Sequence, residues 1–477
     1  MHTLHRYLSL LHHPNAADLI VLAGIVAVVA SVLFLLGWSR PTTIFSIGIA
    51  LEAFSGNWRD IPLPLPLDRV AFLVALLVLF ARGTAAASDR RIVFRPIHFL
   101  LLAIAVYVLL NGLNAGTIEH SYGFYSWLDR LGAIPFLMFT LGPIIFGNQR
   151  QRHVLLVAMV VLGAYLGFTA LAEGAKVTAL VFPRYIENQA LGITQGRARG
   201  PFLASDAMGL ALFDCAALAI VAAVTWTSRR ARWVAWAVAA VDLVGIFFTL
   251  TRSIWLGAIV ALLVTMGAQP RLRRRLPHVA AAGVVVVFVF LVAVPGLITH
   301  VDHRLTYANS VYDRYNTYTA AIRAMEAHPI FGIGWQTFET VGQQYFRQSG
   351  TYPLTGLGLE VHDVFLSHLA EIGIPAACLW LLALLTSVGR AVLQRGPREL
   401  EPWRYALLAM FIVFVSVATF SPLSYALPNL MIWMMAGIVA RDRLSVPRAP
   451  AGVFVVANRS PGGLVLFPGG TALEVAP

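Results

Sequence analysis

The chain has few charged residues and almost no cysteine. Only 12% of its 477 residues are charged and 58% are hydrophobic, with a mean hydropathy of +0.74. Soluble proteins carry about 25% charged residues, so this composition argues against a water-soluble fold. The two cysteines, Cys215 and Cys378, both fall inside apolar runs. They therefore read as small hydrophobic residues, and neither a disulfide framework nor a cysteine metal site is expected.

Several catalytic motifs are missing as well. The sequence contains no Gly-rich phosphate loop, no HExxH, no CxxC and no close pair of outward acidic residues at metal-binding spacing. A nucleotide-driven or metal-centred mechanism is therefore disfavoured, and we expect no cofactor and no metal. Lysine is nearly absent too, because Lys176 is the only one and arginine supplies the rest of the basic charge behind the net +12. These arginines cluster between apolar runs, as in cytoplasmic loops, so no nucleic-acid partner is expected.

Apolar runs of transmembrane length fill most of the chain. They predict an all-α, polytopic integral membrane protein with about twelve transmembrane helices. The first run follows a weakly basic leader and is longer than a signal-peptide core, so we interpret it as a retained helix. A further apolar stretch, 43–54, holds Glu52 and is either a span or a re-entrant or interfacial helix, which leaves the side of the N-terminus open. The predicted spans are residues 19–36, 70–81, 97–110, 133–147, 154–172, 207–225, 233–250, 254–268, 279–295, 364–388, 405–420 and 427–440.

Clusters of arginine orient these spans, because basic residues are enriched in cytoplasmic loops. The outward face then receives residues 114–130, 173–205, the turn 251–253 and the long loop 296–362. We expect a membrane domain over 1–442, with 296–362 as an extracytoplasmic loop within it and 443–477 as a flexible cytoplasmic tail. The clusters assigned to the cytoplasm are Arg90, Arg91 and Arg95; Arg150 and Arg152; Arg229, Arg230 and Arg232; Arg271 and Arg273 to Arg275; Arg395 and Arg398; and Arg441 and Arg443.

The long loop carries a helical pattern. Apolar residues recur at spacings of three and four between Val311 and Met325, which predicts an amphipathic helix. His328, Pro329 and two glycines, Gly332 and Gly334, end it, and a second helix is expected around 335–341. Two such helices over the membrane would form a lid above a cavity.

Five basic residues converge on the outward face: Arg197, Arg199, Arg252, Arg314 and His362. The positive-inside rule predicts few arginines there, so binding of an anionic group is the natural explanation. The alternatives are loop solvation for Arg197, Arg199 and Arg314, snorkelling to lipid phosphates for Arg252, and a surface or capping role for His362.

The polar residues near and inside the apolar spans have structural interpretations. We expect Asp363 to be the N-cap of the helix that follows it. His368 and Glu371 are expected to pack or to hydrogen-bond between helices. Asp214 and Asp242 lie in apolar spans, where a carboxylate is costly, and are expected to be paired within the bundle.

Four motifs occur in order: RARGPF at 197–202, TRSIWLG at 251–257, DRYNTY with AHPIFGIGW at 313–335, and HDVFLSHLAEIGIP at 362–375. With the large loop between the third and the fourth, this order resembles the O-antigen ligase and O-antigen polymerase family of bacterial envelope glycosyltransferases. Two positions depart from the family's pattern: residues 203–206 replace a Gly-Asn-Pro-like stretch, and Asp363 stands where Asn is common. These departures leave the identity of the acceptor open.

The resemblance implies a multispanning enzyme of the bacterial inner membrane with its site on the periplasmic face. Its donor would be a glycan on undecaprenyl diphosphate, and its acceptor a hydroxyl of a glycan or glycolipid. Carried over by motif, the four arginines would hold the diphosphate and His362 would be the catalytic residue, a general base toward the acceptor hydroxyl. Two other classes stay open: a transporter or flippase of lipid-linked oligosaccharide, which would need charged or broken helices near the midplane, and a non-catalytic scaffold.

Overall fold

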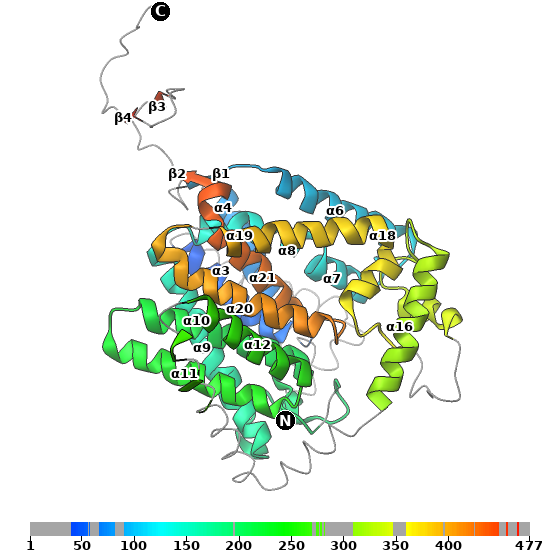
Figure 1. Cartoon of the computed structure of the whole chain (residues 1–477), viewed down its shortest axis with the longest axis horizontal. Coiled ribbons are helices and arrows are strands. Elements are labelled where there is room, and N and C mark those ends of the chain that lie inside the picture. Colours follow the sequence, from blue (N-terminus) through cyan, green and yellow to red (C-terminus); the bar gives the residue numbers. More distant parts are fainter. Residues whose placement is uncertain are drawn as a thin grey trace, which may run out of the picture.

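The computed structural model is an assembly of helices, drawn in Figure 1. It describes residues 40–55, 57, 66–81, 90–193, 196–269, 309–346, 359–394, 396–423 and 425–447, with a few residues between 273 and 281 and two short strands at 455–456 and 465–466. The predicted span 19–36 lies outside the described residues, and so does the span 279–295 apart from a single residue.

The remaining ten predicted spans all fall in helices. The long ones are α4 (Leu67–Ala81), α6 (Pro96–Asn114), α8 (Ala133–Ile145), α9 (Gln149–Gly174), α10 (Ser205–Thr225), α11 (Arg229–Phe248), α12 (Arg252–Ala268), α18 (Val364–Leu384), α20 (Glu401–Ala418) and α21 (Ala426–Val439). Helix α18 continues through a π-helical turn into α19 (Arg390–Leu393). The other helices are α3 (Pro41–Leu51), α7 (Ser121–Arg130), α16 (Asn309–Ala327), α17 (Phe338–Val341) and α22 (Arg441–Leu444).

Strands are minor. β1 (Arg90–Ile92) pairs antiparallel with β2 (Ser445–Pro447), and β3 (Val455–Val456) pairs with β4 (Val465–Leu466). The structure therefore confirms an all-α, multi-pass membrane protein. The number of about twelve spans is not confirmed. In the described part of the chain, seven helical stretches are long and apolar enough to cross a membrane: Pro96–Asn114, Ser121–Ile145, Gln149–Gly174, Ser205–Thr225, Arg229–Phe248, Val364–Leu393 and Arg398–Ala418.

Helix α10 is the centre of the bundle, and nearly all of its residues are buried. Helices α9, α11 and α20 pack around it. Gly163 and Gly167 of α9 let α11 come close, because a Cβ at either position would lie within 2.6 Å of the Asp242 carboxylate. Neither oxygen of Asp242, nor Oδ2 of Asp214, has a hydrogen-bond partner among the described residues. Within the described part of the chain, the predicted pairing is therefore wrong for Asp242.

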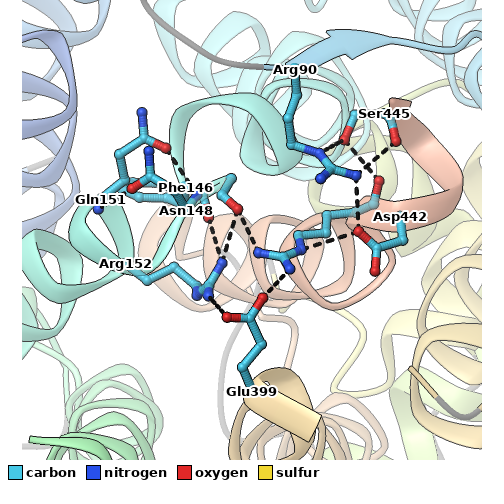
Figure 2. A network of polar contacts seen from close by, with 10 residues as sticks. Arg90, Phe146, Asn148, Gln151, Arg152, Glu399, Asp442 and Ser445 are labelled. Atoms are coloured by element: carbon cyan, nitrogen blue, oxygen red, sulfur yellow. Dashed lines mark hydrogen bonds and ion pairs between the residues drawn. The ribbon is translucent and has the colours of Figure 1, made fainter. Parts of the chain in front are cut away.

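Three of the arginine clusters assigned to the cytoplasm meet at one end of the bundle (Figure 2). Arg152 and Arg441 both pair with Glu399, and both donate to the carbonyl oxygen of Gly147, at 3.1 and 2.5 Å. Arg90 donates to Asp442 at 2.9 Å. Glu399 lies just before α20, whose 18 residues rise about 27 Å, close to the roughly 30 Å of a bilayer's hydrocarbon core. The far end of α20 therefore reaches the opposite face.

The helix predicted in the long loop is confirmed as α16, which ends at Ala327 and packs against α18. The second helix is shorter than predicted, because α17 has only four residues and is followed by a 3₁₀ turn. The segment between them turns at Gly332 and Gly334, which both have positive φ. Its backbone bonds to a kink in α18 at Gly373, with the N–H of Ile374 donating to Pro329 at 2.9 Å. The loop is thus tied to α18.

Candidate functional site

Three of the five predicted site residues come together beyond the far end of α20. His362 directly precedes the N-cap of α18, Arg314 lies near the start of α16, and Arg252 is the first residue of α12. The charge of Arg314 acts on His362, and that of Arg252 acts on Arg314, so Arg314 lies near both of the other residues. Residues from three segments of the sequence therefore form one basic cluster.

The ring of His362 has a defined tautomer. Its Nδ1 lies 3.0 Å from the carbonyl oxygen of Glu360, and a carbonyl can only accept, so Nδ1 carries the hydrogen and a neutral ring keeps its lone pair on Nε2. Burial, and next the charge of Arg314, lower the pKa of His362 below its usual 6.5. The hydroxyl of Tyr318 donates to the carbonyl oxygens of His362, at 3.0 Å, and of Thr419, at 3.1 Å. A neutral imidazole held in this way is suited to accept a proton.

Arg314 and Arg252 have no acidic partner among the residues that the structure describes. Neither forms an ion pair with a carboxylate in the described part of the chain. Arg314 donates to the carbonyl oxygen of Phe420 at 3.3 Å, and its guanidinium lies 5.9 Å from the centre of the Phe420 ring. Its Nε is buried without a hydrogen-bond partner among those residues. Burial, followed by the charge of Arg252, lowers the pKa of Arg314. Two neighbouring cations of this kind attract an anion.

Arg197 adjoins the cluster through a hydroxyl bridge. Its Nη1 donates to Oγ of Ser205 at 3.3 Å, and Thr251, the residue before Arg252, donates to the same oxygen at 3.1 Å. The next residue, Asp206, accepts a hydrogen bond from Ser421, and its charge acts on His362. The start of α10 therefore lies between Arg197 and His362.

Arg199 has different surroundings. It is only 2% exposed, and its guanidinium donates to three backbone carbonyls of its own loop: Leu191 at 2.6 Å, and Ile186 and Asn188 at 2.7 Å each. The backbone N–H groups of Arg199 and Gly200 donate to the carboxylate of Glu173. No described contact brings Arg199 together with Arg252, Arg314 or His362. Its guanidinium is engaged in shaping the loop.

The structural roles expected at the start of α18 are confirmed. Asp363 caps the helix by accepting from the N–H of Leu366 at 2.9 Å. His368 is buried, with its ring 4.6 Å from that of Trp380 in an edge-on arrangement. Glu371 is buried as well and accepts from the N–H of Phe338 at 3.2 Å, which joins α18 to α17.

Sequence reasoning missed an acidic pair beside His362. The carboxyl groups of Glu339 and Glu360 share a hydrogen bond, and Tyr122 of α7 donates to Glu360 at 2.5 Å. Burial, and next the proximity of Glu360, raise the pKa of Glu339 to about 7. Arg130, also in α7, is buried and its charge acts on Glu339. No sequence pattern predicts this cluster of acidic residues with Tyr122 and Arg130, because its members lie in three separate segments of the chain.

Comparison with protein families gives one match. The family described as O-antigen ligase matches residues 237–381, from within α11 to within α18. The matched region contains Arg252, Arg314 and His362, whereas Arg197 and Arg199 lie before it. None of the curated proteins matches the chain. The predicted resemblance to this family is confirmed for the matched region, and it supports an enzyme of the cell envelope that transfers glycans.

Proposed function

We propose, from the match of residues 237–381 to the O-antigen ligases, that the chain transfers a glycan from an undecaprenyl-diphosphate donor to an acceptor hydroxyl. It would act as an O-antigen ligase or as a polysaccharide polymerase, on a glycan or glycolipid acceptor. One observation carries the proposal. A neutral His362 with its lone pair on Nε2 lies near Arg314, Arg314 neighbours Arg252, and neither arginine forms an ion pair with a carboxylate among the described residues.

The chemistry needs two kinds of help. His362 takes the proton of the acceptor hydroxyl on Nε2 while the acceptor oxygen attacks the anomeric carbon of the donor sugar. The bond from that carbon to the diphosphate oxygen breaks, and undecaprenyl diphosphate leaves with the electron pair. Arg252 and Arg314, with Arg197 beside them, stabilise the negative charge that grows on this leaving group. In this proposal arginine, rather than a metal ion, neutralises the diphosphate.

We further propose that the site faces the periplasm from a bacterial inner membrane. The support is the position of Arg90, Arg152 and Arg441 at the opposite end of α20, since basic clusters favour the cytoplasmic side. The division into a membrane domain over 1–442, an outward loop over 296–362 and a cytoplasmic tail over 443–477 belongs to the same proposal.

A second candidate is a transporter or flippase for the same lipid-linked oligosaccharide. The observation that favours it is Asp242, which is fully buried within α11 with neither carboxylate oxygen partnered in the described part of the chain. Ionisable residues inside membrane helices mark transport pathways in many proteins. The basic cluster at the end of the bundle favours the enzyme over the transporter, because a diphosphate leaving group needs positive charge beside it and a pathway through the midplane does not.

A reconstituted assay separates the two. Purified protein in liposomes receives the undecaprenyl-diphosphate donor, with divalent ions removed by EDTA, and the covalent glycan product and the movement of the donor between leaflets are both measured. The proposal expects product without added metal, its loss in His362→Gln, and its retention in the matched control Asp363→Asn, since Asn also caps helices. Movement of donor without any product, or product that requires Mg²⁺ or Mn²⁺, would contradict the proposed mechanism.

A further inference from the structure

A cavity of about 320 Å³ opens beside Arg197, on the side of this residue where α9 and α11 end. Its wall includes Glu173 at the end of α9, Phe248 at the end of α11, and three residues of the segment that follows α9: Lys176, Glu187 and Gln189. Ligand pockets span roughly 300 to 1,000 Å³, so a volume at the lower end suits a small saccharide rather than a lipid tail.

The wall offers the groups that a sugar requires. Carboxylate, amide and ammonium side chains accept from and donate to hydroxyls, and Glu187, Gln189 and Lys176 supply one of each. Phe248 adds an apolar surface on which the carbon face of a ring can pack. Acidic and basic groups are both present, so the cavity is not simply another phosphate site.

The cavity adjoins the basic cluster of the proposed active site. Arg197 contributes to its wall and also donates to Ser205, which in turn accepts from Thr251 beside Arg252. Leu250, two residues before Arg252, is part of the wall as well. A group held by Arg197 and Arg252 would therefore have the cavity directly next to it.

We propose that this cavity binds the first sugars of the donor, those attached to its diphosphate. The inference rests on the proposed function. When the diphosphate is bound at Arg197 and Arg252, the sugars attached to it can enter the cavity while the diphosphate stays in contact with both arginines. The acceptor, in contrast, must reach Nε2 of His362. The described hydrogen bonds of this residue join its Nδ1 to Glu360 and its backbone carbonyl to Tyr318, and neither partner belongs to the cavity wall. The assignment also explains the hydrogen bonds of Arg199, because its guanidinium donates to the carbonyl oxygens of Ile186 and Asn188 and so fixes the backbone on one side of the cavity.

The test compares a sugar-free lipid with four glycosylated forms of it, in the wild type and three variants. Binding to the purified protein is measured for undecaprenyl diphosphate without sugar and for the same lipid carrying glucose, galactose, N-acetylglucosamine or N-acetylgalactosamine. Thr178→Trp fills the cavity from an exposed wall position, and Ala179→Trp, the exposed neighbour outside the wall, is the matched control. Glu187→Gln changes one polar group without added bulk. Binding of the sugar-free lipid reports whether each variant is folded.

The wild type and Ala179→Trp should bind at least one glycosylated lipid about tenfold more tightly than the bare lipid, the effect of a few hydrogen bonds. Thr178→Trp should lose that preference and keep its affinity for the bare lipid, and Glu187→Gln should reduce the preference. Equal affinity of the wild type for all lipids, or an unchanged preference in both cavity variants, would overturn the cavity assignment while the diphosphate site stands. A wild type that binds none of the lipids would contradict the proposal that the donor is an undecaprenyl-diphosphate glycan, and the cavity assignment would fail with it.

Discussion

Replacing Arg199 by glutamine should destabilise the protein, whereas the same replacement at Arg197 should reduce transfer activity. The two residues are separated only by Ala198 in a single motif, and both were predicted to hold the diphosphate. In the structure Arg199 is 2% exposed and donates to three carbonyls, whereas Arg197 is only partly buried and lines a cavity. The pair thus offers an internally matched comparison.

The expected loss follows from the contacts of Arg199. A hydrogen bond from a charged group contributes about 1.5 to 3 kcal/mol, and the low end suits a loop near the surface. Three such bonds would give about 4.5 kcal/mol, and glutamine can restore one of them, so Arg199→Gln should cost about 3 kcal/mol of loop stability. If Arg197 contacts the leaving group as proposed, Arg197→Gln removes a contact to developing charge, for which oxyanion-type donors suggest roughly a 100-fold loss of rate.

The measurements are thermal unfolding of the purified protein, protease cleavage between residues 178 and 200, and glycan transfer. Arg199→Gln should unfold at a lower temperature and be cleaved faster, and its remaining folded fraction should stay active. Arg197→Gln should unfold like the wild type. An Arg199→Gln protein with wild-type unfolding and no activity would refute the reasoning, since Arg199 would then act on the donor rather than on its loop.

Burial and the charge of Arg314 lower the pKa of His362 below the usual 6.5, so the proposed base stays neutral at pH values where an ordinary histidine is protonated. Transfer rates measured against pH should therefore decline only below about 6.5. A decline that begins above this pH would contradict the assignment of His362 as the base. The pKa of Glu339 is raised from its ordinary value of 4.5 to about 7. The protonated acidic pair therefore contributes to the stability of the folded protein fully below pH 4.5, and this contribution is lost as the pH rises through about 7. Glu339→Gln should remove this loss from thermal unfolding measured between about pH 4 and 8, and identical curves for wild type and variant would show that the pair is not its cause. Ser253→Cys should react with an impermeant thiol reagent in outer-permeabilised cells, and Arg443→Cys only after the inner membrane is broken; the reverse pattern would invert the topology.

Local features of the sequence determined the class of protein and most of its helices. Hydropathy reports whether a stretch can leave water, and this depends on adjacent residues alone, so ten predicted spans fall in helices. The spacing of apolar residues from Val311 to Met325 likewise depends on one helix, and α16 confirms it. Asp363 at the start of an apolar run was sufficient to predict its N-cap.

The tertiary structure alone decided which polar groups meet. Arg197 and Arg199 look alike in sequence, and only the fold of residues 186–193 and 196–200 brings three carbonyls to one of them and a cavity to the other. For the same reason, the expected pairing of Asp242 is not found among the described residues, and the contact between Glu339 and Glu360 was not predicted. Whether a helix can enter the membrane depends on its own composition. The hydrogen-bond partner of a polar side chain depends instead on which distant segment packs against that helix.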